Sequence, residues 1–207
     1  MNTRSTRNII ILIGLAFLIA VAFGILRQPK VDTQEITDYL EGMAPVAQEH
    51  LQWIEDYERL TERYAVLGHS EKINELNELL DRMEEIQIDI EESTPPSILS
   101  GVQNKWNREC RLTLQAVYQI ILALDINKPE WIPEAYEFLL EADQLRKEWV
   151  EELSSLLDEC DIEISDFPLG SYYSEATNLS FSQANTCISS TVASLQQRRF
   201  VELQAIL

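Results

Sequence analysis

The sequence has few basic residues, and this shortage excludes several classes of protein. Its 207 residues include 16 Lys and Arg against 35 Asp and Glu, which gives a formal net charge of −19. Four of the basic residues precede position 31, so the remainder of the chain carries 12 basic and 35 acidic residues, or −23. A surface this acidic lacks the clustered Lys and Arg that hold phosphates, so no nucleic-acid partner is expected.

Glycine and proline are also scarce. Six glycines and seven prolines are too few for a turn-rich β-sandwich or a low-complexity chain. A hydrophobic content of 45% is too high for a disordered acidic tail. The composition therefore predicts an all-α protein.

Residues suited to catalysis or metal binding are few. Neither histidine, His50 or His69, follows a glutamate by three positions, and the chain has no Cys-x-x-Cys motif. It also lacks a glycine-flanked serine and a glycine-rich phosphate loop. The many carboxylates are predicted to lie on solvated faces, where they keep ordinary acidity. We therefore expect no enzyme and no cofactor, and His50 is predicted to be a buried histidine hydrogen-bonded across the core rather than a pH sensor.

One long apolar run stands near the N-terminus. Residues 9–26 contain no polar side chain, and 18 helical residues span about 27 Å, close to the hydrocarbon thickness of a bilayer. The pattern predicts a short cytoplasmic stub at 1–8, a transmembrane signal-anchor helix at 9–26 in the lipid bilayer, and an extracytoplasmic acidic domain at 27–207. The alternative is a signal peptide cleaved after Ala22.

A stripe of small residues runs along this apolar segment. Ala16, Ala20 and Gly24 recur every four residues, a spacing that lets two membrane helices approach closely. The stripe is a candidate packing surface for a homodimer, although alanine and glycine are also common in such helices.

The rest of the chain shows helical periodicity interrupted by glycine and proline. A seam of residues spaced three and four apart predicts a long first helix of coiled-coil character, with Pro45 kinking it or marking its true start. Gly68 and Ser70 are predicted to end one helix and cap the next. Helices are predicted at 32–67, 71–92, 97–125, 132–160 and, more weakly, 180–206, with an irregular segment at 161–179. Short connections make sequential helices antiparallel, so an up-down bundle of four to five helices is expected.

Three cysteines leave the redox state open. If the helices have these bounds, Cys110 and Cys160 lie about 20 Å apart along the bundle, beyond the reach of a disulfide. Cys187 can lie level with Cys110, so Cys110–Cys187 is the candidate disulfide. The alternative is three reduced cysteines that pack as small apolar residues.

The leading interpretation is a tethered protein-binding or scaffolding module. A single anchor would hold an acidic helical bundle outside the cytoplasm, where it binds a partner protein. The alternative is a small-molecule-binding sensory module that works through a separate membrane partner. Four tryptophans could line a ligand pocket, but at these helical spacings they are predicted to be core residues.

Overall fold

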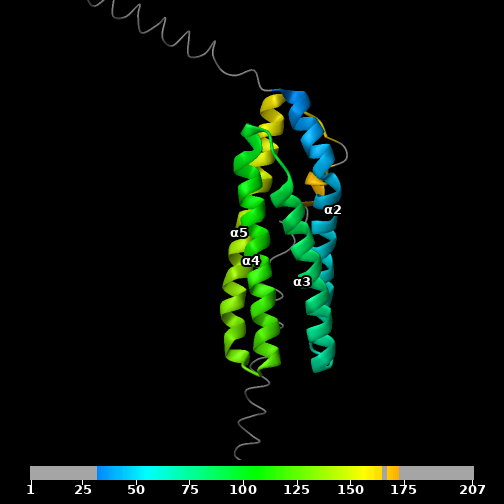
Figure 1. The fold of residues 1–207 in the computed structure, drawn as a ribbon, viewed down its shortest axis with the longest axis vertical. Coiled ribbons are helices and arrows are strands. Elements are labelled where there is room, and N and C mark those ends of the chain that lie inside the picture. Colours follow the sequence, from blue (N-terminus) through cyan, green and yellow to red (C-terminus); the bar gives the residue numbers. More distant parts are fainter. Residues whose placement is uncertain (1–31, 165–166, 173–207) are drawn as a thin grey trace, which may run out of the picture. The chain divides into compact units, whose positions relative to one another are not determined.

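The protein is an all-helical bundle in the part of the chain that the computed structural model describes, residues 32–164 and 167–172. Four long helices pack against one another, and Figure 1 shows α2 beside α3 and α4 beside α5. The long helices are α2 (Thr33–Arg63), α3 (His69–Glu92), α4 (Ser100–Asp125) and α5 (Ile132–Cys160), with short 3-10 turns η1 (Ser97–Leu99) and η2 (Pro129–Trp131) before the last two.

Salt bridges fix the antiparallel direction of neighbouring helices. Across α2 and α3, Arg63 pairs with Glu75 at one end, and Asp56 pairs with Arg82 further along, so the numbering runs in opposite directions. Across α4 and α5, Glu109 meets Arg146, and Lys105 meets Glu152. The predicted antiparallel pairing is therefore confirmed for α2 with α3 and for α4 with α5.

The first helix continues without interruption through its proline. Pro45 lies inside α2, on the exposed side, so the alternative that it marks the start of the helix is wrong. Proline removes one helical hydrogen bond and crowds the preceding turn. The neighbouring positions Met43, Ala44 and Ala47 are buried, and their packing holds the helix together across this defect.

The start of α3 corrects one detail of the predicted turn. Gly68, rather than Ser70, is the N-cap residue of α3, and its backbone N–H donates to a side-chain oxygen of Glu71 at 2.7 Å. A carboxylate in the first turn accepts a hydrogen bond from a backbone N–H that has no partner within the helix. Its negative charge is also stabilised by the positive end of the helix dipole. The first helix accordingly ends at Arg63, earlier than the predicted residue 67.

The core runs the length of the bundle and contains three of the four tryptophans. Trp53, Trp106 and Trp149 are buried, as predicted, whereas Trp131 is only partly buried. The indole N–H of Trp53 donates to the Leu79 carbonyl oxygen at 2.6 Å, so even this apolar contact between α2 and α3 carries a hydrogen bond. The ring of Trp53 also stacks on Tyr57, with centroids 5.3 Å apart.

The proposed membrane anchor lies outside the residues that the structure describes. Residues 9–26, the stripe Ala16, Ala20 and Gly24, and the weak helix at 180–206 all belong to that undescribed part. Within the described helices, none combines the length and apolar character needed to cross a bilayer.

Candidate functional site: a buried polar cluster

Ionisable side chains from three helices meet at the centre of the bundle. His50 of α2 and Glu109 of α4 are fully buried, and Arg146 of α5 is 1% exposed. Arg146 Nε donates to Glu109 Oε1 at 2.8 Å, and His50 Nε2 lies 3.3 Å from the same oxygen. The second oxygen, Glu109 Oε2, accepts a hydrogen bond from Trp149 Nε1 at 2.8 Å. One carboxylate therefore attracts donors from the two helices on either side of it.

The hydrogen bonds of His50 assign its proton. Trp106 Nε1 donates to His50 Nδ1 at 3.2 Å, and an indole nitrogen can only donate. His50 Nδ1 therefore carries the lone pair, and the ring proton sits on Nε2, which faces Glu109. The Tyr172 hydroxyl lies 3.0 Å from His50 Nδ1 and donates to the Ala47 carbonyl oxygen at 2.8 Å.

A second carboxylate completes the charge balance. Asp143, 6% exposed, lies 3.5 Å from Arg146 Nη1 and accepts a bond from Lys147 Nζ at 2.8 Å. Two carboxylates then face one guanidinium and one ammonium. Buried charges are tolerated when they are paired and hydrogen-bonded in this way. We call His50, Trp106, Glu109, Asp143, Arg146, Trp149 and Tyr172 the central polar cluster.

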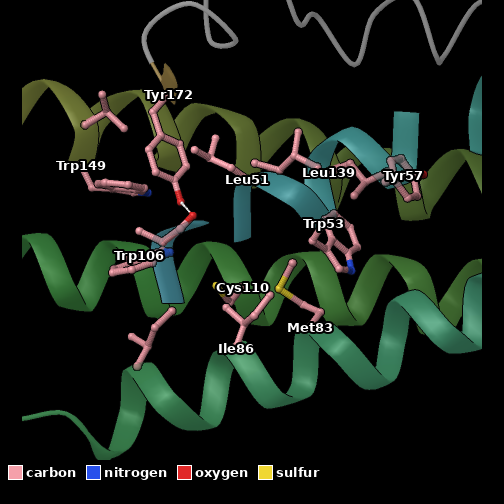
Figure 2. Packing of buried hydrophobic residues seen from close by; sticks show 14 of the residues in the cluster. Leu51, Trp53, Tyr57, Met83, Ile86, Trp106, Cys110, Leu139, Trp149 and Tyr172 are labelled. Carbon is pink, nitrogen blue, oxygen red and sulfur yellow. Dashed lines mark hydrogen bonds between the residues drawn. The ribbon is translucent and has the colours of Figure 1, made fainter. Parts of the chain in front are cut away.

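Aromatic rings cover one end of the central polar cluster. Figure 2 shows Trp106, Trp149 and Tyr172 gathered together, with Trp53 and Tyr57 further along the core. Trp106 stacks on Trp149 at a centroid distance of 5.3 Å, and Tyr172 meets Trp149 edge to face at 5.0 Å. Phe167 adds an edge contact to Trp106 at 6.3 Å. The segment after α5 thus folds back onto the cluster through two aromatic side chains.

Little empty space remains beside these rings. A cleft bounded by Trp106, Trp149 and Phe167 has a volume of about 10 Å³. That volume is about what one water molecule needs, and far below the several hundred Å³ of a typical small-molecule site.

The surroundings of Glu109 keep its carboxyl group ionised. Burial by itself raises the pKa of Glu109, but the His50 ring, the Arg146 guanidinium and the Trp149 indole outweigh that effect and lower the pKa to about 2. Favourable donors therefore more than offset desolvation here. Glu109 is therefore an ionised carboxylate whose two oxygens are held by donors of the protein itself.

The predictions for the individual site residues have mixed outcomes. The prediction of a buried, hydrogen-bonded His50 is confirmed. The prediction that carboxylates lie on solvated faces is wrong for Glu109 and Asp143, because Arg146 and Lys147 neutralise them inside the bundle. A signal was present: Glu109 falls three residues after Trp106 on the apolar face of α4.

Cys110 is fully buried beside the central polar cluster. Burial raises the pKa of its thiol well above the usual value, and the charge of Glu109 adds to the increase. A thiol of this kind is a poor nucleophile. No disulfide joins Cys110 to Cys160, in agreement with their predicted separation, while Cys187 lies outside the described residues and the Cys110–Cys187 pairing stays a prediction.

Neither a metal-binding arrangement among the described residues nor similarity to known proteins indicates a function for this chain. Among residues 32–164 and 167–172, no group of three or more His, Cys, Asp or Glu side chains is arranged to hold a metal ion. Comparison with known proteins finds no match to this chain among protein-family models, curated proteins or solved structures. The function is therefore inferred from the residues themselves.

The coupling between Glu109 and Arg146 can be measured in a double-mutant cycle. We expect Glu109→Met or Arg146→Met alone to lower the free energy of unfolding by about 3–5 kcal/mol, because each removes a buried charge partner. The double substitution should cost less than either single one, since it removes both charges together. Urea unfolding followed by circular dichroism measures these values.

The matched control is the exposed pair Arg108 and Glu141, which also joins α4 to α5. Its coupling energy should stay below about 1 kcal/mol, as is usual for surface ion pairs. Additive losses from Glu109→Met and Arg146→Met would contradict the proposed coupling.

Acid should weaken the fold through Glu109. Its pKa is about 2 in the folded protein against an ordinary 4.5, so the ionised carboxylate stabilises the native state fully above pH 4.5. That contribution, about 3 kcal/mol, is lost as the pH falls from 4.5 towards 2. Urea unfolding over this pH range should show a shallower decline for the Glu109→Met/Arg146→Met variant than for the parent, and equal slopes would refute the assignment.

Proposed function

We propose that the chain is a membrane-anchored helical-bundle protein that binds or scaffolds a partner protein outside the cytoplasm. The apolar run at 9–26 supports the anchor, with its stub of 1–8 on the cytoplasmic side. The observation that carries the binding role is the closed interior of the bundle. Glu109 is hydrogen-bonded to Arg146 and Trp149, and the aromatic cleft beside them holds only about 10 Å³.

A closed interior favours protein binding over the alternative of a small-molecule sensory module. A ligand seated beside the central polar cluster would have to displace Phe167 or Tyr172, and Tyr172 is fully buried and hydrogen-bonded to the backbone of α2. A partner protein needs only the outer surface, which the fold leaves accessible. The acidic character of that surface favours partners with basic patches.

Membrane attachment and topology can be tested on the full chain. We expect it to stay in the membrane pellet after an alkaline wash, and a variant without residues 9–26 to move to the supernatant. Tyr118, 59% exposed on α4, offers a labelling site. In a Cys160→Ser/Cys187→Ser background, Tyr118→Cys should react with a membrane-impermeant maleimide in intact cells, whereas the background chain should react much less because its remaining Cys110 is buried.

The binding role has its own test in the same cells. Crosslinking followed by purification should recover one stoichiometric partner with the full chain, and purified partner and chain should reassociate in detergent. Labelling of Tyr118→Cys only after lysis would refute the topology. A metabolite that raises the melting temperature of a chain with no protein partner would favour the sensory alternative.

A further inference from the structure

An open groove between α2 and α3 has balanced charge in an otherwise acidic protein. The groove has a volume of about 620 Å³ and is bordered by the second half of α2 and the first half of α3. The two leucines that line it are 1% and 5% exposed, and its other lining residues are charged, so its accessible surface combines charged groups with the apolar stems of their side chains. Its charged residues are Asp56, Arg59 and Arg63 on α2, and Glu75, Glu78 and Arg82 on α3. These three cations and three anions cancel, in a chain of net charge −19.

Two salt bridges across the groove show which residues lie level with each other. Arg63 pairs with Glu75 at 2.6 Å, and Asp56 pairs with Arg82 at 2.6 Å. One helical turn from the first pair towards the second reaches Arg59 on α2 and the vicinity of Glu78 on α3. Arg59 and Glu78 therefore stand at nearly the same height on opposite walls.

Arg59 and Glu78 each carry a charge that forms no salt bridge across the groove. The side chain of Arg59 is 59% exposed, and its ion-pair partners, Glu55 and Asp56, lie on its own helix. Glu78 is exposed and forms no salt bridge with the other described residues. The α2 wall thus presents a guanidinium outward, and the α3 wall presents a carboxylate at the same level.

A two-fold axis along the groove would bring these opposite charges together. Rotation about an axis parallel to the helices keeps every residue at its own height and places the α2 wall of one copy against the α3 wall of the other. We propose that this groove is the contact face of a symmetric homodimer, in which Arg59 of each copy pairs with Glu78 of the other. An isologous interface of this kind needs a self-complementary patch, and the groove supplies one.

The rest of the molecule explains why a second copy fits this face in particular. Two bodies of strong negative charge repel each other wherever acidic surfaces meet, and this repulsion selects the charge-balanced face. Val66, 85% exposed, lies in the turn after α2, three residues beyond Arg63 of the groove, and adds an exposed apolar side chain nearby in the sequence. The axis also brings both α2 N-termini to the same end, which suits two copies anchored in one membrane; only this last point rests on the proposed function.

Charge reversal gives a test in which two defective variants should rescue each other. The full chain, purified in detergent, should be a dimer by sedimentation velocity and native mass spectrometry. Arg59→Glu and Glu78→Arg should each weaken dimerisation by at least about tenfold, because both symmetric contacts become like-charge pairs. In a mixture, each introduced charge meets its opposite in the other variant at both contacts, so a heterodimer should form.

The matched control is Arg108→Glu on α4, a position 65% exposed and paired with Glu141, like Arg59 a surface arginine with a carboxylate partner. This variant should remain a dimer of parental affinity, and circular dichroism should show that all variants keep their helix content. A monomeric parent chain, a variant that stays dimeric alone, or a mixture that stays monomeric would each overturn the proposal. Persistent dimers of Arg59→Glu would direct attention to the stripe at Ala16, Ala20 and Gly24.

Discussion

The burial of one ionised carboxylate constrains this bundle more than any other feature. Glu109 has no exposed surface, so its charge must be compensated by protein groups. The compensation comes from Arg146 and Trp149 on α5 and from His50 on α2. Apolar packing alone tolerates helices that slide by a turn, whereas these donors have to meet one carboxylate at hydrogen-bond distance. The polar centre therefore fixes the relative register of α2, α4 and α5.

The same centre ties the segment after α5 to the bundle. Tyr172 reaches the Ala47 carbonyl and the ring of His50, and its ring packs against Trp149. Loss of the carboxylate would disturb His50 and Trp149 and so loosen both groups that hold Tyr172. The interior is thus both filled and cross-linked by hydrogen bonds. This is why we place the binding function on the outer surface rather than in the core.

Much of the fold could be predicted from the sequence, because local signals define the helices. Gly68, the Thr94-Pro95-Pro96 run and Pro129 mark the breaks, and the predicted bounds of the later helices agree with the structure within about three residues. The polar centre could not be predicted from periodicity alone. On α5 the apolar Leu145 is only partly buried, whereas its charged neighbour Arg146 is buried. The burial of a charged side chain such as Arg146 can be predicted only when its partner is known. That partner, Glu109, lies 37 residues away in the sequence.

The most direct test of the account is the titration of Glu109 itself. The side-chain carboxyl carbon of Glu109, labelled with ¹³C and assigned by comparison with Glu109→Gln, reports its ionisation by NMR as the pH is lowered. The account predicts that the signal stays that of a carboxylate through pH 4.5 and changes only as the pH approaches about 2 or the protein unfolds. A midpoint near 4.5 in the folded protein would contradict it, because the carboxylate would then lack the donors on which the bundle depends.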